Sequence, residues 1–239
     1  MTENLYLKDS YTQTFEAVVT GVDPENHGII LDQTAFYPGG GGQPADMGTI
    51  SFGDQSYPLK RARKISGAIV HQVEPGLSLP QVGTRVLGQL DWDRRYALMR
   101  THTAMHILCG VIFRDYGASV TGGNIEFLKG SMDFEFESMH RDLVDEINAN
   151  INREVANQRQ VSTRILPRQQ AFQIPDLIRT KINLLPEGIR EVRVVEIEGL
   201  DVQADGGTHV RNTSEVGQIR VADYKSKGKI NKRIYVELN

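Results

Sequence analysis

Cysteine is nearly absent from this chain of 239 residues, which contains a single one, at position 109. One cysteine excludes a disulfide framework and a zinc site built mainly from thiolates. The sequence also lacks any apolar run near the roughly 20 residues that cross a bilayer. Its opening segment, MTENLYLKDSYTQTFE, has neither the basic nor the apolar region of a secretory signal. We therefore expect a cytoplasmic protein with no membrane partner.

An excess of positive charge is absent as well. The chain has 27 lysines and arginines against 30 aspartates and glutamates, for a formal net charge of −3. This balance argues against a general nucleic-acid coat but leaves room for a local basic patch. One such patch is predicted near the C-terminus, at Lys225, Lys227, Lys229, Lys232 and Arg233. These cations are candidates to contact phosphates, and the alternative is a solvated turn between two strands.

The first ninety residues are predicted to form a small antiparallel β-barrel. Short β-prone runs occupy residues 14–22, 27–34, 48–52, 67–73 and 84–92. Segments rich in Gly, Pro, Asn and Asp separate them, at residues 22–28, 37–48, 52–58 and 74–83. Short strands at this spacing are typical of a closed barrel.

The character of the sequence changes at Asp91, so we expect two domains, residues 1–90 and 91–239. Helical spacing predicts a long helix over Trp92–Tyr116 and a second over Arg141–Arg159. The second helix carries an apolar stripe of Leu143, Ile147, Ile151 and Val155. Strand-like runs at 130–138, 161–166, 189–198, 217–224 and 229–238, with a short helix around Pro175–Lys181, complete the pattern. This mixed order predicts an α+β fold with a mixed or antiparallel sheet.

The long predicted helix contains His102 and His106, four residues apart. Residues at this spacing share one helix face, so both imidazoles can converge on one metal ion. The alternative is two polar residues on a partly exposed face. A metalloprotease of the HExxH type would need a glutamate beside the first histidine, and Thr103 occupies that position.

A second candidate ligand pair, Asp205 and His209, lies in the segment DGGTH. His209 can supply a third nitrogen and Asp205 an oxygen, whereas the alternative is a glycine turn with an exposed histidine. Cys109 shares the helix face of the two histidines. Seven residues place it about 10 Å along the axis from His102, too far for one tetrahedral zinc ion. We expect Cys109 to be buried in the core.

Four consecutive glycines, Gly39, Gly40, Gly41 and Gly42, precede Gln43. Such a run is costly in conformational entropy, so it is expected where the main chain passes close to a ligand or to another domain. A flexible hinge is the alternative. Gly41-Gly42-Gln43 also matches, over three residues only, the ester-hydrolysing tripeptide of translation release factors. That match makes Gln43 a candidate catalytic residue.

In combination, HTAMHIL, FYPGGGGQ and GGTHV with TSEVG resemble the freestanding alanyl-tRNA editing proteins called AlaX. These are related to the editing domain of alanyl-tRNA synthetase and, more distantly, to that of threonyl-tRNA synthetase. The resemblance covers nearly the whole chain, and its length fits the medium form. It implies a translation-protein-like β-barrel followed by an α+β editing domain, in which the HxxxH helix packs on the sheet.

The resemblance also implies an activity, hydrolysis of the ester that joins a wrong amino acid to alanine tRNA. Serine is the expected amino acid, with glycine as a second candidate. One zinc ion would be held by His102, His106 and His209. The family's cysteine ligand corresponds to Asp205, which is a departure. Aspartate is a harder and weaker zinc donor than thiolate. We nevertheless expect Asp205 to bind the metal ion. The alternative is that Asp205 orients the attacking water.

Several residues are candidates to bind or process the substrate. Thr34 is a candidate to hydrogen-bond a serine hydroxyl and thereby reject alanine, and Thr103 is a second candidate. The glycine run can donate main-chain hydrogen bonds to the aminoacyl adenosine. Lys229, Lys232 and Arg233 are expected to contact the tRNA.

Two other functions fit the same sequence. One is a non-catalytic tRNA-binding or translation-accessory module with a structural or degenerate metal site, and Asp205 in place of cysteine is the feature that leaves it open. The other is a zinc hydrolase of small molecules, which the barrel and the basic patch disfavour. The sequence leaves open the oligomeric state, the metal and the recognition of alanine tRNA.

Overall fold

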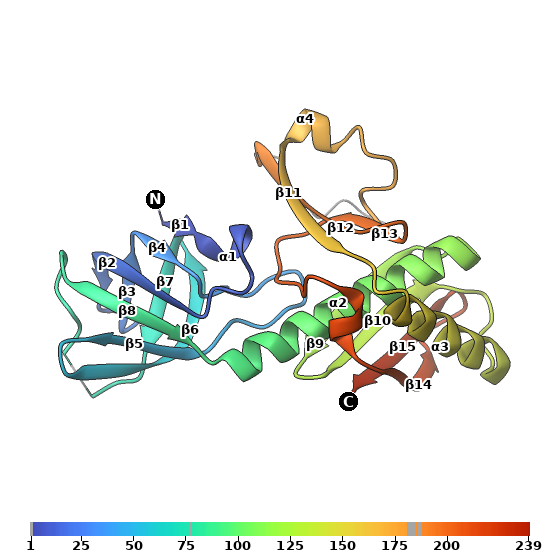
Figure 1. Ribbon diagram of the computed structural model, residues 1–239, viewed down its shortest axis with the longest axis horizontal. Coiled ribbons are helices and arrows are strands. Elements are labelled where there is room, and N and C mark those ends of the chain that lie inside the picture. Colours follow the sequence, from blue (N-terminus) through green and yellow to red (C-terminus); the bar gives the residue numbers. More distant parts are fainter. Residues whose placement is uncertain (1, 77, 181–184, 186–187) are drawn as a thin grey trace. The chain divides into compact units, whose positions relative to one another are not determined.

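The computed structural model describes residues 2–76, 78–180, 185 and 188–239 (Figure 1). The chain divides into two compact units, Met1–Ala97 and Leu98–Asn239. Unit 1 is a β-barrel, and unit 2 combines helices with two antiparallel sheets. The predicted α+β class, with the barrel first in the chain, is therefore confirmed.

Unit 1 is built on a closed six-stranded barrel in which each strand pairs antiparallel with its neighbours, in the order β2-β3-β7-β6-β5-β8. The apolar residues at alternate positions point inward, and Ile29, Leu31 and Ile50 are completely buried. The barrel strands are β2 (Thr14–Asp23), β3 (Gly28–Leu31), β5 (Gly48–Phe52), β6 (Gln55–Ile65), β7 (Ala68–Val73) and β8 (Arg85–Leu90). Outside the barrel lie β1 (Glu3–Asn4), α1 (Leu5–Lys8) and β4 (Gln33–Thr34).

The longest barrel strand, β6, corrects one expectation. The segment 52–58 is predicted as a separator, yet the strand begins at Gln55 and only two residues link it to β5. Tyr57 and Leu59 are buried and Pro58 between them is exposed, which is the alternation of a half-buried strand. Pro58 and the polar residues around it hide this alternation in the sequence.

The long helix is α2, which begins at Trp92, as predicted, and ends at Tyr116; its first six residues belong to unit 1 and the rest to unit 2. Every residue from 101 to 112 is buried, so the helix is enclosed on all sides along this stretch. A four-stranded antiparallel sheet has the order β14-β15-β10-β9, and a three-stranded one has the order β11-β12-β13. Their strands are β9 (Val120–Glu126), β10 (Lys129–Glu135), β11 (Val161–Pro167), β12 (Glu191–Ile197), β13 (Asp201–Ala204), β14 (Ile219–Ser226) and β15 (Asn231–Leu238).

Two glycines allow close packing around α2. A Cβ atom at Gly130 of β10 would lie 2.5 Å from Sδ of Met105. A Cβ atom at Gly110 would lie 2.9 Å from Cγ of Leu200 and 3.0 Å from Cβ of Asp201. Any side chain there would push these neighbours away, because real Cβ atoms do not approach so closely. Gly110 thus brings the start of β13 against the helix that carries the two histidines.

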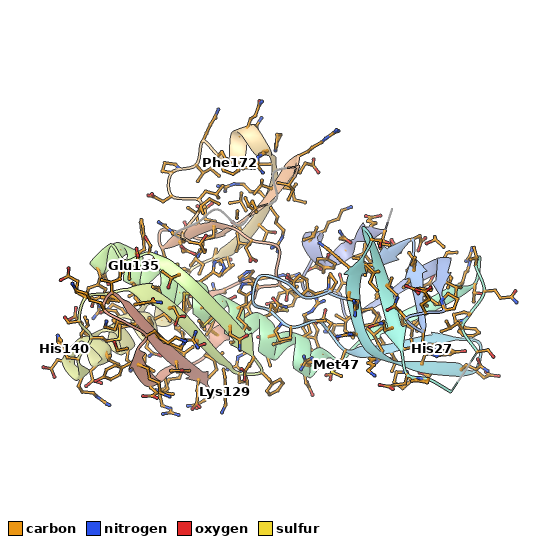
Figure 2. All side chains as sticks on the ribbon, turned by 180° about the vertical axis from the view of Figure 1, so that it is seen from behind. His27, Met47, Lys129, Glu135, His140 and Phe172 are labelled. Carbon is orange, nitrogen blue, oxygen red and sulfur yellow. The ribbon has the colours of Figure 1, made fainter. Side chains whose placement is uncertain are left out.

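The second helix, α3 (Arg141–Ala156), follows His140, which is labelled in Figure 2. The His140 side chain accepts a hydrogen bond from the main-chain N–H of Leu143. Its buried face differs from the predicted stripe. Ile147 and Ile151 are buried as expected, but Leu143 and Val155 are only half-buried. Val144 and Glu154 complete the buried face instead. Glu154 is accommodated because its carboxylate pairs with two arginines, Arg114 and Arg159.

The short helix predicted around Pro175–Lys181 is wrong for the part that the structure describes. Residues 175–180 contain no helix, and Lys181 lies outside the described residues. The short helix of this region is α4 (Arg168–Ala171), which follows Pro167 directly. Pro167 is the N-cap residue, and its extended backbone, with a ψ of 139°, marks the change from strand to helix. Further along, a 3₁₀ helix, η1 (Thr213–Val216), lies inside the predicted TSEVG motif.

No helix among the residues that the structure describes is long and apolar enough to cross a membrane.

Candidate metal centre

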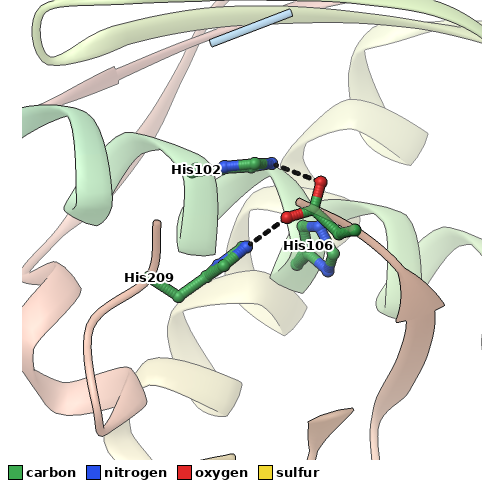
Figure 3. Close-up of side chains that lie close together, drawn as sticks. His102, His106 and His209 are labelled. Atoms are coloured by element: carbon green, nitrogen blue, oxygen red, sulfur yellow. Dashed lines mark hydrogen bonds and ion pairs between the residues drawn. The ribbon is translucent and has the colours of Figure 1, made fainter. Parts of the chain in front are cut away.

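Four predicted ligands, from two segments of unit 2 that are far apart in the sequence, lie together in the structure. His102 and His106 come from one face of α2, whereas Asp205 and His209 lie in the loop that follows β13 (Figure 3). One donor atom from each residue lies within 4.8 Å of the others. All three histidines are buried and Asp205 is half-buried. The structure therefore brings together the four side chains that the sequence pattern selected.

The spacing of these donors suits a tetrahedral metal ion. Nε2 of His102 is 3.5 Å from Oδ1 of Asp205, and Nε2 of His209 is 3.1 Å from Oδ2 of the same carboxylate (Figure 3). Bonds of about 2.0–2.1 Å place neighbouring donors of tetrahedral zinc roughly 3.4 Å apart. The cluster can thus hold a metal ion with small rotations of its side chains.

His106 is oriented by a carboxylate that does not belong to the donor set. Its Nδ1 lies 3.0 Å from Oδ2 of Asp201, so Nε2 is the nitrogen left for a metal. Asp201 is buried and also accepts hydrogen bonds from Gln203 (2.8 Å) and Arg179 (3.3 Å). A carboxylate behind a histidine ligand fixes the ring orientation and raises the basicity of the ligating nitrogen.

His209 is oriented by Thr103. The Thr103 hydroxyl lies 3.2 Å from Nδ1 of His209 and accepts a hydrogen bond from the main-chain N–H of Val210 at 3.3 Å. The hydroxyl is completely buried behind the imidazole. The structure thus places Thr103 against a candidate ligand. Its predicted contact with a substrate serine stays a prediction.

The loop that carries Asp205 is fixed to β12. The buried side chain of Arg193 donates hydrogen bonds to the carbonyls of Asp205 (3.1 Å) and Gly207 (2.8 Å). The N–H of Gly207 in turn donates to Oδ2 of Asp205 at 2.7 Å. These bonds hold the carboxylate in place before any ion binds, which lowers the entropic cost of binding.

The protonation states suit metal binding. Burial lowers the pKa of His102 to about 4, although the Asp205 charge opposes this, so the ring is neutral near pH 7. Burial and the neighbouring His102 hold the pKa of His209 well below its ordinary value. Burial alone would lower the pKa of His106, but Asp201 reverses the direction and raises it. Burial would raise the pKa of Asp205, but the surrounding histidines keep it well below the ordinary value. A carboxylate and at least two neutral imidazoles are therefore available as donors.

Cys109 is buried in the core, as expected. As its distance along the helix from His102 predicts, it is not part of the donor cluster. Burial raises the pKa of its thiol well above the ordinary value. Metal binding needs the thiolate, so this residue is a poor competing ligand.

Thr34 belongs to unit 1, and its hydroxyl is completely buried. It lies 2.8 Å from Nε2 of the buried His71 and accepts a hydrogen bond from the N–H of Phe36 at 3.1 Å. Burial lowers the pKa of His71 to about 4, so the ring is neutral. Its Nε2 can accept a hydrogen bond from the Thr34 hydroxyl while Nδ1 donates one to the carbonyl of Ile29. Thr34 therefore fixes the chain that leads into the glycine run.

The glycine run forms an exposed turn in unit 1. All four glycines have positive φ angles, between 57° and 134°, which other residues adopt only with strain. The N–H of Gly40 donates to the carbonyl of Gln43 at 3.1 Å, and the N–H of Gln43 donates back at 2.9 Å. Gln43 itself is buried. The expected close approach of this main chain to a ligand, and a catalytic role of Gln43, stay predictions.

The predicted basic patch near the C-terminus is largely engaged within the protein. The Lys232 ammonium donates to the carbonyls of Gly228 and Lys229, at 2.9 and 3.0 Å. Arg233 makes two hydrogen bonds to the carboxylate of Asp133, at 2.6 and 2.7 Å. Lys229 is exposed. Contact of these three residues with tRNA stays a prediction.

Sequence reasoning missed Asp201 and Arg193. Asp201 lies only four residues before Asp205, but no spacing rule links a carboxylate to a histidine 95 residues earlier in the chain. Arg193 is one residue in a β-prone run and carries no motif. The strand pairing that places β12 beside β13 reveals both of them.

Comparison with known proteins yields relatives over the full chain. Residues 7–94 match the family described as tRNA synthetases class II (A), and residues 192–235 match the threonyl and alanyl tRNA synthetase second additional domain. The chain is 41% identical over 239 residues to the alanyl-tRNA editing protein AlaX-M of Saccharolobus solfataricus, covering 98% of each chain. It is 38% identical over 245 residues to the protein of that name from Methanosarcina acetivorans, covering 100% of this chain and 99% of the relative.

Longer relatives match over a smaller part of their length. The alanine–tRNA ligase of Ignicoccus hospitalis is 37% identical over 226 residues, which cover 92% of this chain and 24% of the ligase.

Proposed function

The chain belongs to the family of alanyl-tRNA editing proteins, and we propose that it deacylates alanine tRNA mischarged with serine, with glycine as a second substrate. The observation that carries this proposal is the buried cluster of three imidazoles and one carboxylate in unit 2. A donor set of three nitrogens and one oxygen suits a zinc ion. The expected partner is aminoacylated tRNA, and the expected compartment is the cytoplasm.

His102, His106, His209 and Asp205 would hold the metal ion. When bound, zinc supplies Lewis acidity, which polarises an ester carbonyl or lowers the pKa of a water molecule. The reaction adds the oxygen of water to the carbonyl carbon and breaks the bond from that carbon to the ribose oxygen. The terminal ribose hydroxyl leaves with a proton, and the free amino acid is released.

The protein's own residues prepare the donors for this reaction. Asp201 holds His106, and Thr103 holds His209, so that the Nε2 atoms face the centre of the cluster. Arg193 fixes the main chain on both sides of Gly206. A site whose donors are held in advance does not need to reorganise during the reaction. This preorganisation accounts for much of the rate enhancement of many enzymes.

A deacylation assay tests the proposed function directly. Ser-tRNA(Ala), Gly-tRNA(Ala) and Ala-tRNA(Ala) are incubated with the protein, with zinc and with a chelator. We expect zinc-dependent hydrolysis of the seryl ester and survival of the alanyl ester. If zinc-loaded protein hydrolyses none of the three, the proposal is wrong, and a non-catalytic tRNA-binding or translation-accessory module with a structural metal site becomes the better description.

Replacing Asp201 with asparagine should weaken metal binding about 10- to 100-fold. The carboxylate contacts Nδ1 of His106 at 3.0 Å, and asparagine keeps its size but not its charge. Competition with a zinc-binding dye gives the affinity of both proteins. Asp223→Asn, an exposed carboxylate of β14, serves as the matched control and should bind zinc like the wild type. Equal affinities for Asp201→Asn and the wild type would show that this carboxylate does not support the metal.

Replacing Thr34 with valine should reduce the discrimination between seryl and alanyl esters about tenfold. We propose that the hydroxyl contributes to serine selection, because a pocket that pairs a substrate hydroxyl disfavours the substrate without one. Ratios of kcat/KM for Ser-tRNA(Ala) and Ala-tRNA(Ala) provide the measurement. His71→Gln, which removes the imidazole partner and keeps Thr34, separates selection from local disorder. Unchanged seryl hydrolysis with alanyl tRNA still spared in Thr34→Val would exclude this role.

A further inference from the structure

The largest concentration of exposed cations in unit 1 lies on β6, where four of the five residues from Lys60 to Lys64 are basic. We propose that the exposed basic side chains of β6, Lys60, Arg61, Arg63 and Lys64, bind the phosphate backbone of the tRNA substrate. This inference rests on the proposed function, because it takes aminoacylated tRNA as the occupant. It assigns RNA contacts to the four cations on β6, in addition to those predicted for the C-terminal turn.

A β-bulge produces this concentration of charge. Leu59 pairs with Val73, but Arg61 pairs with Gln72, the adjacent residue of β7. Two residues of β6 therefore lie opposite a single residue of β7. Because of the extra residue, Lys60 and Arg61 are both exposed between the buried Leu59 and Ala62. In a regular strand one of these two cations would point into the barrel. The bulge therefore gathers side chains that simple alternation would separate.

Arg61, within this basic run, is held in a fixed orientation. Its Nε donates a hydrogen bond to Oε1 of Gln72 at 2.8 Å. Gln72 is anchored in turn, because its Nε2 donates to the carbonyl of Asn26 at 3.2 Å. With Nε engaged, the two terminal nitrogens are the donors that suit a phosphate, and an oriented guanidinium loses less entropy on binding.

The charge on β6 is not neutralised by its neighbours. Neither β5 nor β7, the two strands that pair with β6, contains an acidic residue. Among the described residues, the four cations of β6 form no ion pair, whereas other exposed cations do: Lys8 with Glu3, Lys129 with Glu237 and Arg141 with Asp145 (Lys129 is labelled in Figure 2). Such a patch attracts a polyanion, whereas the rest of the protein, in a chain with a net charge of −3, repels it.

The test compares two variants of the full-length protein that lose the same charge. The β6 variant is Lys60→Gln/Arg61→Gln/Arg63→Gln/Lys64→Gln. The control variant is Lys8→Gln/Lys129→Gln/Arg141→Gln/Arg153→Gln, which removes four exposed cations from other elements. Fluorescence anisotropy gives the Kd for an uncharged tRNA(Ala) transcript across a salt series. A smaller variant, Arg63→Gln/Lys64→Gln, leaves the bulge intact and guards against misfolding of the larger one.

At about 0.1 M salt we expect the β6 variant to bind the transcript at least tenfold more weakly, with the salt slope reduced by about 2 to 4. The smaller variant should show about half of the change in slope, and the control variant little change. Hydrolysis of 3′-O-seryl-adenosine, which has no phosphate backbone, should be equal in all of them. Equal loss of tRNA affinity in the β6 and control variants, or loss of seryl-adenosine hydrolysis in the β6 variants, would overturn the inference.

The same experiment separates this inference from the proposed function. A wild-type protein that hydrolyses neither ester, while the β6 variants still lose tRNA affinity, would disprove the hydrolase and retain the phosphate-binding surface. If the wild-type protein hydrolyses the esters and the β6 variants have an unchanged KM for Ser-tRNA(Ala), the hydrolase is retained and the phosphate-binding surface is disproved.

Discussion

Replacing His209 with alanine should lower kcat/KM for Ser-tRNA(Ala) by about 10³-fold or more. The imidazole is buried between Thr103 and Asp205, and its Nε2 would be one of three nitrogen donors to the proposed metal ion. Two nitrogens and a carboxylate hold a zinc ion much more weakly than three nitrogens and a carboxylate. A metal ion in a hydrolytic site stabilises the transition state by several kcal/mol, and about 4 kcal/mol corresponds to 10³-fold.

The measurement pairs the rate with the zinc content of the purified protein. His140→Ala is a suitable control, because this histidine caps α3 on the surface and is not part of the donor cluster. It should keep both zinc and activity, with a loss of about 1 kcal/mol in stability from the cap. A His209→Ala protein that loses zinc and still deacylates at the wild-type rate would place the chemistry elsewhere. The metal ion would then have only a structural role.

The donor cluster was predictable from the sequence because each half of it is a local pattern. His102 and His106 share a helix face at a spacing of four, and Asp205 and His209 flank a glycine turn. The residues that orient these donors were not predictable. Asp201 reaches His106 only because Gly110 lets β13 approach α2, and that contact joins positions far apart in the chain.

The fold was predictable where hydrophobic periodicity is strong and was not where polar residues or packing interrupt it. The bounds of α2 and most strands follow from alternation or helical spacing. Strand β6 was missed altogether, because Pro58 and four cations mask its inward residues. On α3, Leu143 lies at the predicted spacing, but the buried face is rotated toward Val144 and Glu154. Packing partners decide such a rotation, and a single sequence does not contain them.

The basic turn shows a different limit of sequence reasoning. Lys232 and Arg233 count as cations in any composition, yet both are satisfied by carbonyls and by Asp133. Charge that is paired within the protein attracts a polyanion less than unpaired charge does. Arg233 meets Asp133 because of the register of β15 against β10, which only the structure gives.

Replacing Asp46 with alanine should destabilise unit 1 by about 3–5 kcal/mol, because it leaves a buried guanidinium without its counter-charge. Arg95, at the start of α2, and Asp46 are 0% and 1% exposed. Nε of Arg95 lies 3.0 and 3.1 Å from the two carboxylate oxygens, and Nη2 contacts Oδ2 as well. The remaining donors reach the carbonyls of Ser10 and Ala35, so no part of the guanidinium faces water.

Urea unfolding followed by tryptophan fluorescence measures this loss in the right part of the chain. Trp92 is the single tryptophan, and it belongs to unit 1. Asp93→Ala, an exposed carboxylate in the first turn of α2, is the matched control and should cost less than about 1 kcal/mol. The double variant Asp46→Leu/Arg95→Met should recover much of the stability, since apolar residues of similar size avoid the unpaired charge.

The same substitution should also loosen the glycine run. Oδ2 of Asp46 accepts a hydrogen bond from the N–H of Tyr37 at 2.6 Å, and the N–H of Asp46 donates to the carbonyl of Tyr37 at 3.0 Å. These two bonds close the base of the loop that contains Gly39–Gly42, and alanine removes the first. Hydrogen exchange of the Tyr37 amide should therefore accelerate beyond the change in global stability. A loss below 1 kcal/mol together with unchanged exchange would mean that the loop is held by other contacts, and that the ion pair is not what joins it to α2.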